Sequence, residues 1–190
     1  ARLVSAVSAT GDLDALPLGV EFTLASGWKI YWRTPGEAGL APVIDLSTSS
    51  TPDLTGTIKW PLPKRFDAFG FDHFGYENAV ILPFDVTGHE VGAPVRIVAE
   101  LEALACADIC VPLTGRLEMT LPDGDPVATP HAQPLAQVAA MVPRRAEEGG
   151  ISASGPSLRP ERVETRDNGL FVAFKQDAPP IAEIFVEGQE

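Results

Sequence analysis

The chain contains two cysteines, Cys106 and Cys110, with three residues between them. Two thiols at this spacing can carry out reversible thiol-disulfide exchange, form a permanent disulfide, or share a metal ion. In an extended strand their Cα atoms would lie roughly 13 Å apart at about 3.3 Å per residue, whereas a disulfide needs them within about 7 Å. Apolar alternation fades before Cys106, and Pro112 follows Cys110 closely. These observations predict a pair at a strand end or loop, with a turn between the cysteines if they are bonded.

The three kinds of chemistry are not equally supported. A bridge closing so short a loop constrains the unfolded chain by only roughly 2 kcal/mol, so it would be a weak staple. The metal interpretation lacks a ligand cluster, because His73, His89 and His131 are scattered and Met119 and Met141 form no methionine-rich motif. Redox exchange is therefore favoured, and it implies no cofactor. A structural disulfide and a copper-handling site stay open as alternatives.

The residues near the cysteines in the sequence are acidic. Glu100, Glu102 and Asp108 surround the pair, and the nearest base in the sequence is Arg116. Because nearby cations favour the thiolate, we expect no strongly depressed thiol pKa. Such a pair suits a passive relay that its partner activates, unlike a thioredoxin active site with its two-residue spacer.

The segments that must position this pair have the alternation of half-buried β-strands. Strands are predicted at residues 18–24, 28–32, 57–60, 80–86, 95–101 and 116–121. The first two predict a hairpin or adjacent strands, with Trp28 and Trp32 in the core, and residues 36–39 predict a turn. Eighteen prolines and seventeen glycines indicate many short elements joined by turns. The pattern predicts an all-β antiparallel sandwich.

The carboxyl-terminal part of the chain changes character. Residues 134–142 have helical spacing that Pro143 ends, so they predict one short helix. We expect a β-sandwich domain at residues 1–145 and a linker at 146–150. Residues 151–190 then form the start of a second β-domain or strands added to the first. Strand patterns in this tail lie at residues 161–166, 170–175 and 181–187.

Composition excludes several kinds of partner. The formal net charge is −12, from 26 acidic against 14 basic residues. Nucleic acid and anionic membrane surfaces are therefore poor partners. The sequence has no apolar run near the roughly twenty residues that a membrane-spanning helix needs.

Four motifs together resemble a known family. They are Gly27-Trp-Lys-Ile-Tyr-Trp-Arg-Thr-Pro-Gly36 with Gly39 and Pro42, Trp60-Pro-Leu-Pro63, Gly75-Tyr-Glu-Asn-Ala-Val-Ile-Leu-Pro83, and Cys106-Ala-Asp-Ile-Cys-Val-Pro112. In order and spacing they resemble the amino-terminal periplasmic domain of DsbD-type transmembrane thiol-disulfide reductases, and more closely their ScsB branch, which is linked to copper tolerance. The resemblance covers roughly residues 15–125.

The resemblance implies an immunoglobulin-like sandwich with the cysteine pair on its surface. It implies a periplasmic protein-disulfide reductase component within a membrane-embedded parent protein. The domain would accept electrons from a thioredoxin-like domain of that parent and pass them to periplasmic thioredoxin-like oxidoreductases. Cys110 would bond to partners and Cys106 would be the resolving thiol. The three-residue spacer is shorter than in the best-known DsbD proteins and leaves the partner's identity open.

In DsbD-like domains an aromatic loop covers the disulfide and moves aside when a partner docks. The segment from Phe71 to Tyr76 matches that loop, so the resemblance implies a cover or docking role for Phe71, Phe74 and Tyr76, with Phe74 as the shield. The alternative is that the phenylalanines of this region, Phe66, Phe69, Phe71 and Phe74, fill the sandwich core.

Overall fold

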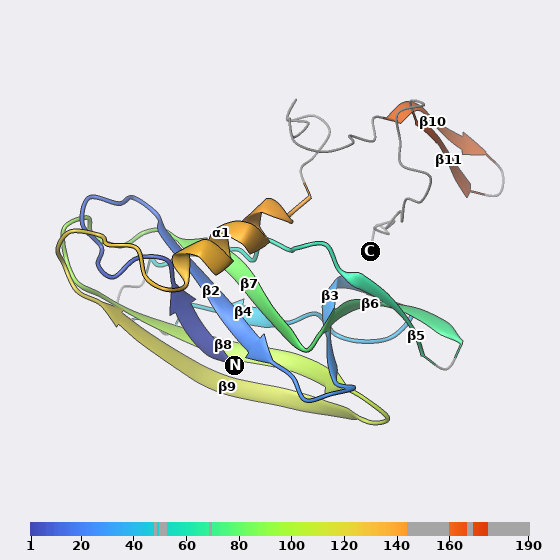
Figure 1. The fold of residues 1–190 in the computed structure, drawn as a ribbon, viewed down its shortest axis with the longest axis horizontal. Coiled ribbons are helices and arrows are strands. Elements are labelled where there is room, and N and C mark those ends of the chain that lie inside the picture. Colours follow the sequence, from blue (N-terminus) through green and yellow to red (C-terminus); the bar gives the residue numbers. More distant parts are fainter. Residues whose placement is uncertain (48, 50–52, 69, 144–159, 167–168, 175–190) are drawn as a thin grey trace. The chain divides into compact units, whose positions relative to one another are not determined.

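The computed structural model describes residues 1–47, 49, 53–68, 70–143, 160–166 and 169–174. The chain divides into two units, Ala1–Pro143 and Arg144–Glu190. The described part of the first unit forms strands and one short helix (Figure 1). Its strands are β1 (Arg2–Ser5), β2 (Leu16–Thr23), β3 (Lys29–Gly36), β4 (Val43–Asp45), β5 (Lys64–Ala68), β6 (Phe71–Glu77), β7 (Ala79–Val86), β8 (Val95–Cys106) and β9 (Cys110–Leu121).

Two antiparallel sheets make up the first unit. The smaller sheet has the order β1-β2-β7. In the larger sheet β8 pairs with β9 along its whole length, and it also pairs with β4 at Glu100–Glu102 and with β3 at its carboxyl end. From β3 the sheet continues through β6 to the edge strand β5. The predicted all-β antiparallel sandwich is confirmed.

The core consists of the inward-facing residues of both sheets, as the period of two requires. Its most deeply buried side chains, at most 2% exposed, include Leu16, Leu18, Val20, Phe22, Leu82, Phe84 and Val86 from the smaller sheet, and Ile30, Trp32, Ile97 and Ala99 from the larger one. Trp32 thus lies in the core as predicted, whereas Trp28 is only partly buried.

The predicted helix is present as α1 (Ala132–Ala140). Its Leu135 packs against Val4 and Ile81, so α1 covers the face of the smaller sheet that points away from the core. No helix among the described residues combines the length and the apolar character needed to cross a membrane.

Two strand predictions are wrong. Residues 18–24 and 28–32 form β2 and β3, but the two strands lie in different sheets, because alternation reports which face is buried and not which strand is the neighbour. Residues 57–60 form no strand. Lys59 donates a single backbone hydrogen bond to the Pro83 carbonyl, 2.7 Å away, and the prolines that follow cannot extend a ladder. Strands β1, β4, β5 and β6 were not predicted.

In the second unit β10 (Pro160–Arg166) pairs with β11 (Gly169–Phe174) in an antiparallel hairpin. These strands correspond to the patterns at residues 161–166 and 170–175. The predicted linker at 146–150 and the strand pattern at 181–187 lie outside the described residues. That residues 151–190 begin a second β-domain stays a prediction.

Candidate redox site

The two cysteines lie at the tip of the β8–β9 hairpin. Cys106 ends β8, Cys110 begins β9, and the two are Cα partners in the register. Ala107 N–H donates to the Ile109 carbonyl across the turn, at 2.9 Å. A disulfide joins Cys106 and Cys110, whose Cα atoms are 4.1 Å apart. The predicted turn between the cysteines is confirmed.

The hairpin itself places the sulfurs together. In an antiparallel ladder hydrogen-bonded residue pairs alternate with narrow pairs, whose Cα atoms lie about 4.5 Å apart. Because the bonded pair is Ala107 with Ile109, the cysteines occupy the narrow pair next to it. Their side chains therefore leave the same face of the sheet, directly opposite one another. The disulfide links two positions that the backbone already holds close.

The two sulfur-bearing residues differ in accessibility. Cys106 is 7% exposed, whereas Cys110 and its neighbour Ile109 are exposed. An incoming group therefore meets Cys110 first, and Cys106 lies behind it.

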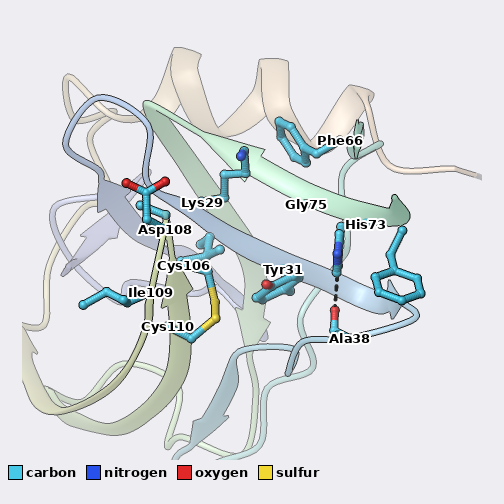
Figure 2. A pocket seen from close by; sticks show the side chains of 13 residues that line it. Lys29, Tyr31, Ala38, Phe66, His73, Gly75, Cys106, Asp108, Ile109 and Cys110 are labelled. Atoms are coloured by element: carbon cyan, nitrogen blue, oxygen red, sulfur yellow. Dashed lines mark hydrogen bonds between the residues drawn. A yellow bond between two sulfur atoms is a disulfide. The ribbon is translucent and has the colours of Figure 1, made fainter. Parts of the chain in front are cut away.

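A pocket of about 380 Å³ opens beside the disulfide (Figure 2). Four parts of the chain line it, mostly with apolar and aromatic groups. They are Lys29, Ile30 and Tyr31 of β3, Ala38 of the following loop, Phe66, Phe71, His73 and Gly75 of β5 and β6, and the hairpin tip from Cys106 to Cys110.

Strand register brings the pocket's strand residues, apart from the core residue Ile30, to one face of the larger sheet. Lys29 is the cross-strand partner of Cys106, and Tyr31 is the partner of Gly75. A Cβ atom on Gly75 would lie 2.1 Å from the backbone oxygen of Ile30, so this close approach of β3 and β6 requires glycine.

The loop after β3 fixes the far wall of the pocket. His73 Nδ1 lies 2.9 Å from the Ala38 carbonyl, which can only accept, so Nδ1 carries the proton. The His73 ring centroid is 6.1 Å from that of Tyr31, and a Cβ atom on Gly39 would lie 2.5 Å from the Tyr31 ring. Burial raises the pKa of Tyr31, which keeps its phenol neutral. Residues 36–39, predicted only as a turn, thus hold the pocket's aromatic wall.

Of the three predicted cover residues, only Phe71 lines this pocket. Side chains alternate along β6, so Phe74 and Tyr76 lie on the opposite face of the strand from Phe71. The Tyr76 hydroxyl donates to the Pro61 carbonyl at 2.8 Å, and Phe74 is half-buried with the Arg65 guanidinium 5.6 Å from its ring centroid. Phe69 lies outside the described residues. Phe66, considered only as a core residue, joins Phe71 in the pocket.

Sequence reasoning missed Lys29. The absence of a nearby base was judged from sequence distance, yet Lys29 lies directly across from Cys106. Its Nζ is 5.0 Å from the Phe66 ring centroid, a cation–π contact. Arg116, the nearest base in the sequence, instead contacts Glu100 at 2.7 Å and Glu118 at 2.8 Å. Only the β3–β8 register, which the sequence pattern did not contain, could have revealed the lysine.

Metal ligands do not gather at this site in the part of the chain that the structure describes. No group of three or more His, Cys, Asp or Glu side chains is arranged there to hold a metal ion. His73 and His89 each bond to a different backbone carbonyl, of Ala38 and Leu13 respectively.

An antiparallel β-sandwich with a solvent-accessible disulfide at a hairpin tip defines a class of small redox domain. The family model described as Thiol:disulfide interchange protein DsbD, N-terminal, matches residues 2–122. The chain belongs to this family, and the resemblance inferred from the four motifs is confirmed.

One solved structure supports the assignment. The N-terminal periplasmic domain of ScsB from Proteus mirabilis is 30% identical with a TM-score of 0.58, over 74% of this chain and 53% of that one. The chain thus spans about half of that domain's length. The fold of the chain is an immunoglobulin-like sandwich. The reduced DsbD N-terminal domain of Neisseria meningitidis is 18% identical with a TM-score of 0.35, over 67% of this chain and 90% of that one. The search of curated proteins gave no match.

Proposed function

We propose that this domain relays electrons by thiol-disulfide exchange in the periplasm. It receives them from a thioredoxin-like domain of its membrane-embedded parent reductase and passes them to periplasmic thioredoxin-like oxidoreductases. The observation that carries the proposal is the disulfide at an exposed hairpin tip, beside an apolar pocket, in a chain of the DsbD N-terminal family. Membership of this family supports a periplasmic location, and the periplasm is an oxidising compartment in which disulfides form.

The exchange has two steps. The thiolate of reduced Cys110 attacks a partner's disulfide, whose S–S bond breaks, and the departing partner sulfur takes up a proton. The thiolate of Cys106 then attacks Cys110 Sγ, the mixed disulfide breaks, and the second partner sulfur leaves and is protonated. The partner gains two electrons and the Cys106–Cys110 disulfide forms again. The exposure of Cys110 and the burial of Cys106 support this order.

The surface around Cys110 fits a thioredoxin-like partner. Ile109 is 67% exposed, and Phe71 and Leu113 are exposed as well. Among the described residues β9 pairs only with β8, so its outer edge is open beside Cys110. Pro112 lacks an N–H on this edge, which leaves an apolar surface poor in backbone donors.

The aromatic cover of the disulfide belongs, in this proposal, to Phe71 and Phe66, with the remaining predicted residues Phe74 and Tyr76 supporting β6 from its other face. Phe66 on β5 and Phe71 on β6 both line the pocket beside the sulfurs. The two rings therefore border the side of the disulfide that faces the pocket.

Trapping tests the proposed function. Cys106→Ala removes the resolving thiol, so it should accumulate a mixed disulfide with an oxidised thioredoxin-like domain, whereas Cys110→Ala should accumulate little. The Cys106→Ala/Cys110→Ala double variant is the matched control and should form none. Adducts mainly through Cys106 would reverse the two roles. An absence of adducts from either folded single variant would support the alternative of a structural bridge.

A redox titration separates the same alternatives without a partner. A relay disulfide should be reduced within the range of periplasmic exchange proteins, while a structural one resists reduction to below about −300 mV. Thiol alkylation followed by mass spectrometry reports the reduced fraction at each potential.

A further inference from the structure

The larger sheet brings one cation to the buried cysteine. Lys29 on β3 and Cys106 on β8 are Cα partners. Directly opposite residues of antiparallel strands point to the same face, with Cβ atoms about 4.5 to 5.5 Å apart. Both side chains line the same pocket. The flexible four-carbon stem of Lys29 can therefore carry its ammonium group to Cys106 Sγ.

Lys29 is not committed to a carboxylate. Its other cross-strand partner, Glu77 on β6, lies 2.7 Å from Lys64 Nζ, and Lys29 forms no ion pair within the described residues. Figure 2 shows Lys29 beside Cys106 with its ammonium group turned toward Phe66. In the oxidised domain the sulfurs are uncharged, so they do not draw the ammonium group away from this weak cation–π contact.

Other titratable groups face the same space. They are Asp108 of the turn, Tyr31 of β3, His73 and Glu77 of β6, Lys64 of β5 and Cys110 of β9. Asp108 opposes a thiolate but is exposed, so solvent screens its charge. Tyr31 stays protonated, and the Glu77 carboxylate forms an ion pair with Lys64. Lys29 is the cation placed directly across from the sulfur that must become negative.

We propose that Lys29 is an electrostatic positioning residue whose ammonium group leaves Phe66 on reduction and stabilises the Cys106 thiolate. The inference rests on the proposed function and deepens its second step, in which this thiolate attacks Cys110 Sγ and releases the partner sulfur. A larger thiolate fraction at neutral pH speeds that release. The passive relay expected from the acidic sequence neighbours thus has one built-in activator, on its resolving thiol.

The test measures the Cys106 thiol in the whole chain, without any partner. Cys110→Ser leaves Cys106 as the sole thiol, and the ultraviolet absorbance of the thiolate is followed against pH. Adding Lys29→Met should raise the titration midpoint by about one pH unit, since an opposite charge at this range lowers a pKa by one unit or more. The thiolate fraction at pH 7 then falls by up to about tenfold. Lys29→Arg should restore most of the shift.

Lys59→Met is the matched control, because Lys59 pairs with Asp85 of β7, in the other sheet. It removes the same charge and should leave the midpoint within about 0.3 of a pH unit. An unchanged midpoint in Lys29→Met, or an equal shift in Lys59→Met, overturns the proposal. If Lys29→Met does not fold, Lys29→Gln is the second neutral variant and keeps a polar side chain at this position; it should raise the midpoint by a similar amount, and an unchanged midpoint in it overturns the proposal. Failed trapping by Cys106→Ala would remove the proposed function while leaving this thiol titration intact.

Discussion

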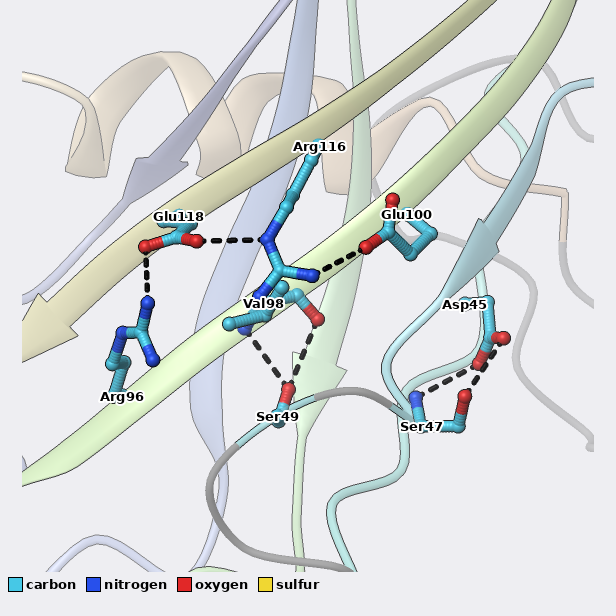
Figure 3. A network of polar contacts seen from close by, with 8 residues as sticks. All are labelled: Asp45, Ser47, Ser49, Arg96, Val98, Glu100, Arg116 and Glu118. Carbon is cyan, nitrogen blue, oxygen red and sulfur yellow. Dashed lines mark hydrogen bonds and ion pairs between the residues drawn. The ribbon is translucent and has the colours of Figure 1, made fainter.

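One face of the β8–β9 hairpin carries two different surfaces. In its middle, Arg96 and Glu100 of β8 alternate with Arg116 and Glu118 of β9, linked by ion pairs of 2.6 to 2.8 Å (Figure 3). At its tip the same face carries the disulfide and borders a pocket with aromatic walls. The middle satisfies its charges within the hairpin, whereas the cation opposite the buried cysteine of the tip comes from β3.

The comparison shows that register, and not sequence distance, decides which charge acts on which group. Arg116 is the base nearest to Cys110 in the sequence, yet its guanidinium donates hydrogen bonds to Glu118 and Glu100, and these bonds raise its pKa. Lys29 is remote in sequence and lies opposite Cys106. The following changes test how far the tip and the middle differ, in order of decreasing effect.

Gly75→Ala should have the largest effect, because its Cβ would meet the Ile30 backbone oxygen at 2.1 Å, which only movement of β3 or β6 can relieve. We expect a loss of about 3 kcal/mol or more in the free energy of unfolding. The matched control in the hairpin's middle is Gly115→Ala, whose Cβ meets nothing within 4 Å and should change stability by less than about 1 kcal/mol. Equal losses in the free energy of unfolding of the two variants, measured by urea denaturation, would show that the close approach of β3 and β6 at Gly75 does not require glycine.

Phe74→Ala and Phe71→Ala should separate packing from access. Phe74→Ala should lower the free energy of unfolding by about 1 to 3 kcal/mol, which is less than the loss at a fully buried phenylalanine, because Phe74 is half-buried. It should not selectively expose the disulfide. Phe71→Ala should cost less than about 1 kcal/mol, since Phe71 is 47% exposed, but should raise the rate of reduction by dithiothreitol a few-fold. A faster reduction in Phe74→Ala alone would restore Phe74 as the shield.

Tyr76→Phe tests the face of β6 turned away from the disulfide. Loss of the hydrogen bond to Pro61 should cost about 1 kcal/mol and leave the reduction rate unchanged. Burial raises the pKa of Tyr76 above its ordinary value of 10. The stability that the protonated Tyr76 phenol contributes is therefore complete below about pH 10 and is lost as pH rises further. Because Tyr76→Phe removes this group, the variant should lose less stability at alkaline pH than the parent.

Arg116→Met should have the smallest effect, although it removes two ion pairs, because all the groups involved are solvent-exposed. We expect Tm to fall by no more than about 2 °C at neutral pH. Hydrogen bonds from Arg116 and Arg96 lower the pKa of Glu118, so their contribution is present above about pH 4 and is lost as pH falls through the lowered value. The Tm difference from the parent should shrink at acidic pH, and a constant difference would contradict the ion-pair account.

The sequence predicted the parts of the fold that local pattern determines. Alternation identified β2 and β7, because both bury one complete face, and the short spacer with Pro112 identified the turn at the cysteines. It did not identify β5 and β6, because β6 mixes aromatic residues on both faces and Gly75 interrupts its alternation. The family motifs nevertheless marked this segment as part of the site.

What the sequence did not reveal about the site is which residues lie opposite one another on neighbouring strands. Phe71 and Phe74 are indistinguishable by type, and only the facing of β6 separates them. Lys29 entered the sequence comparison as one letter of a family motif, and its chemistry became visible only with the β3–β8 pairing. Long-range register joins strands that are distant in the chain, so no local window contains it.

The narrow cross-strand position of the cysteines has a consequence for the energetics of a redox cycle. Because the hairpin already closes the three-residue loop, reducing the disulfide releases little additional chain freedom in the folded domain. In the unfolded chain the same bridge still restricts the loop, so the oxidised form should be more stable to unfolding than the reduced form by roughly 2 kcal/mol. A thermodynamic cycle then lowers the reduction potential of the folded pair by the corresponding amount below that of the same pair in the unfolded chain. Every 30 mV of departure corresponds to about 1.4 kcal/mol. Loop closure accounts for roughly 40 mV of this departure, and any remainder measures the electrostatic contribution of the pocket groups.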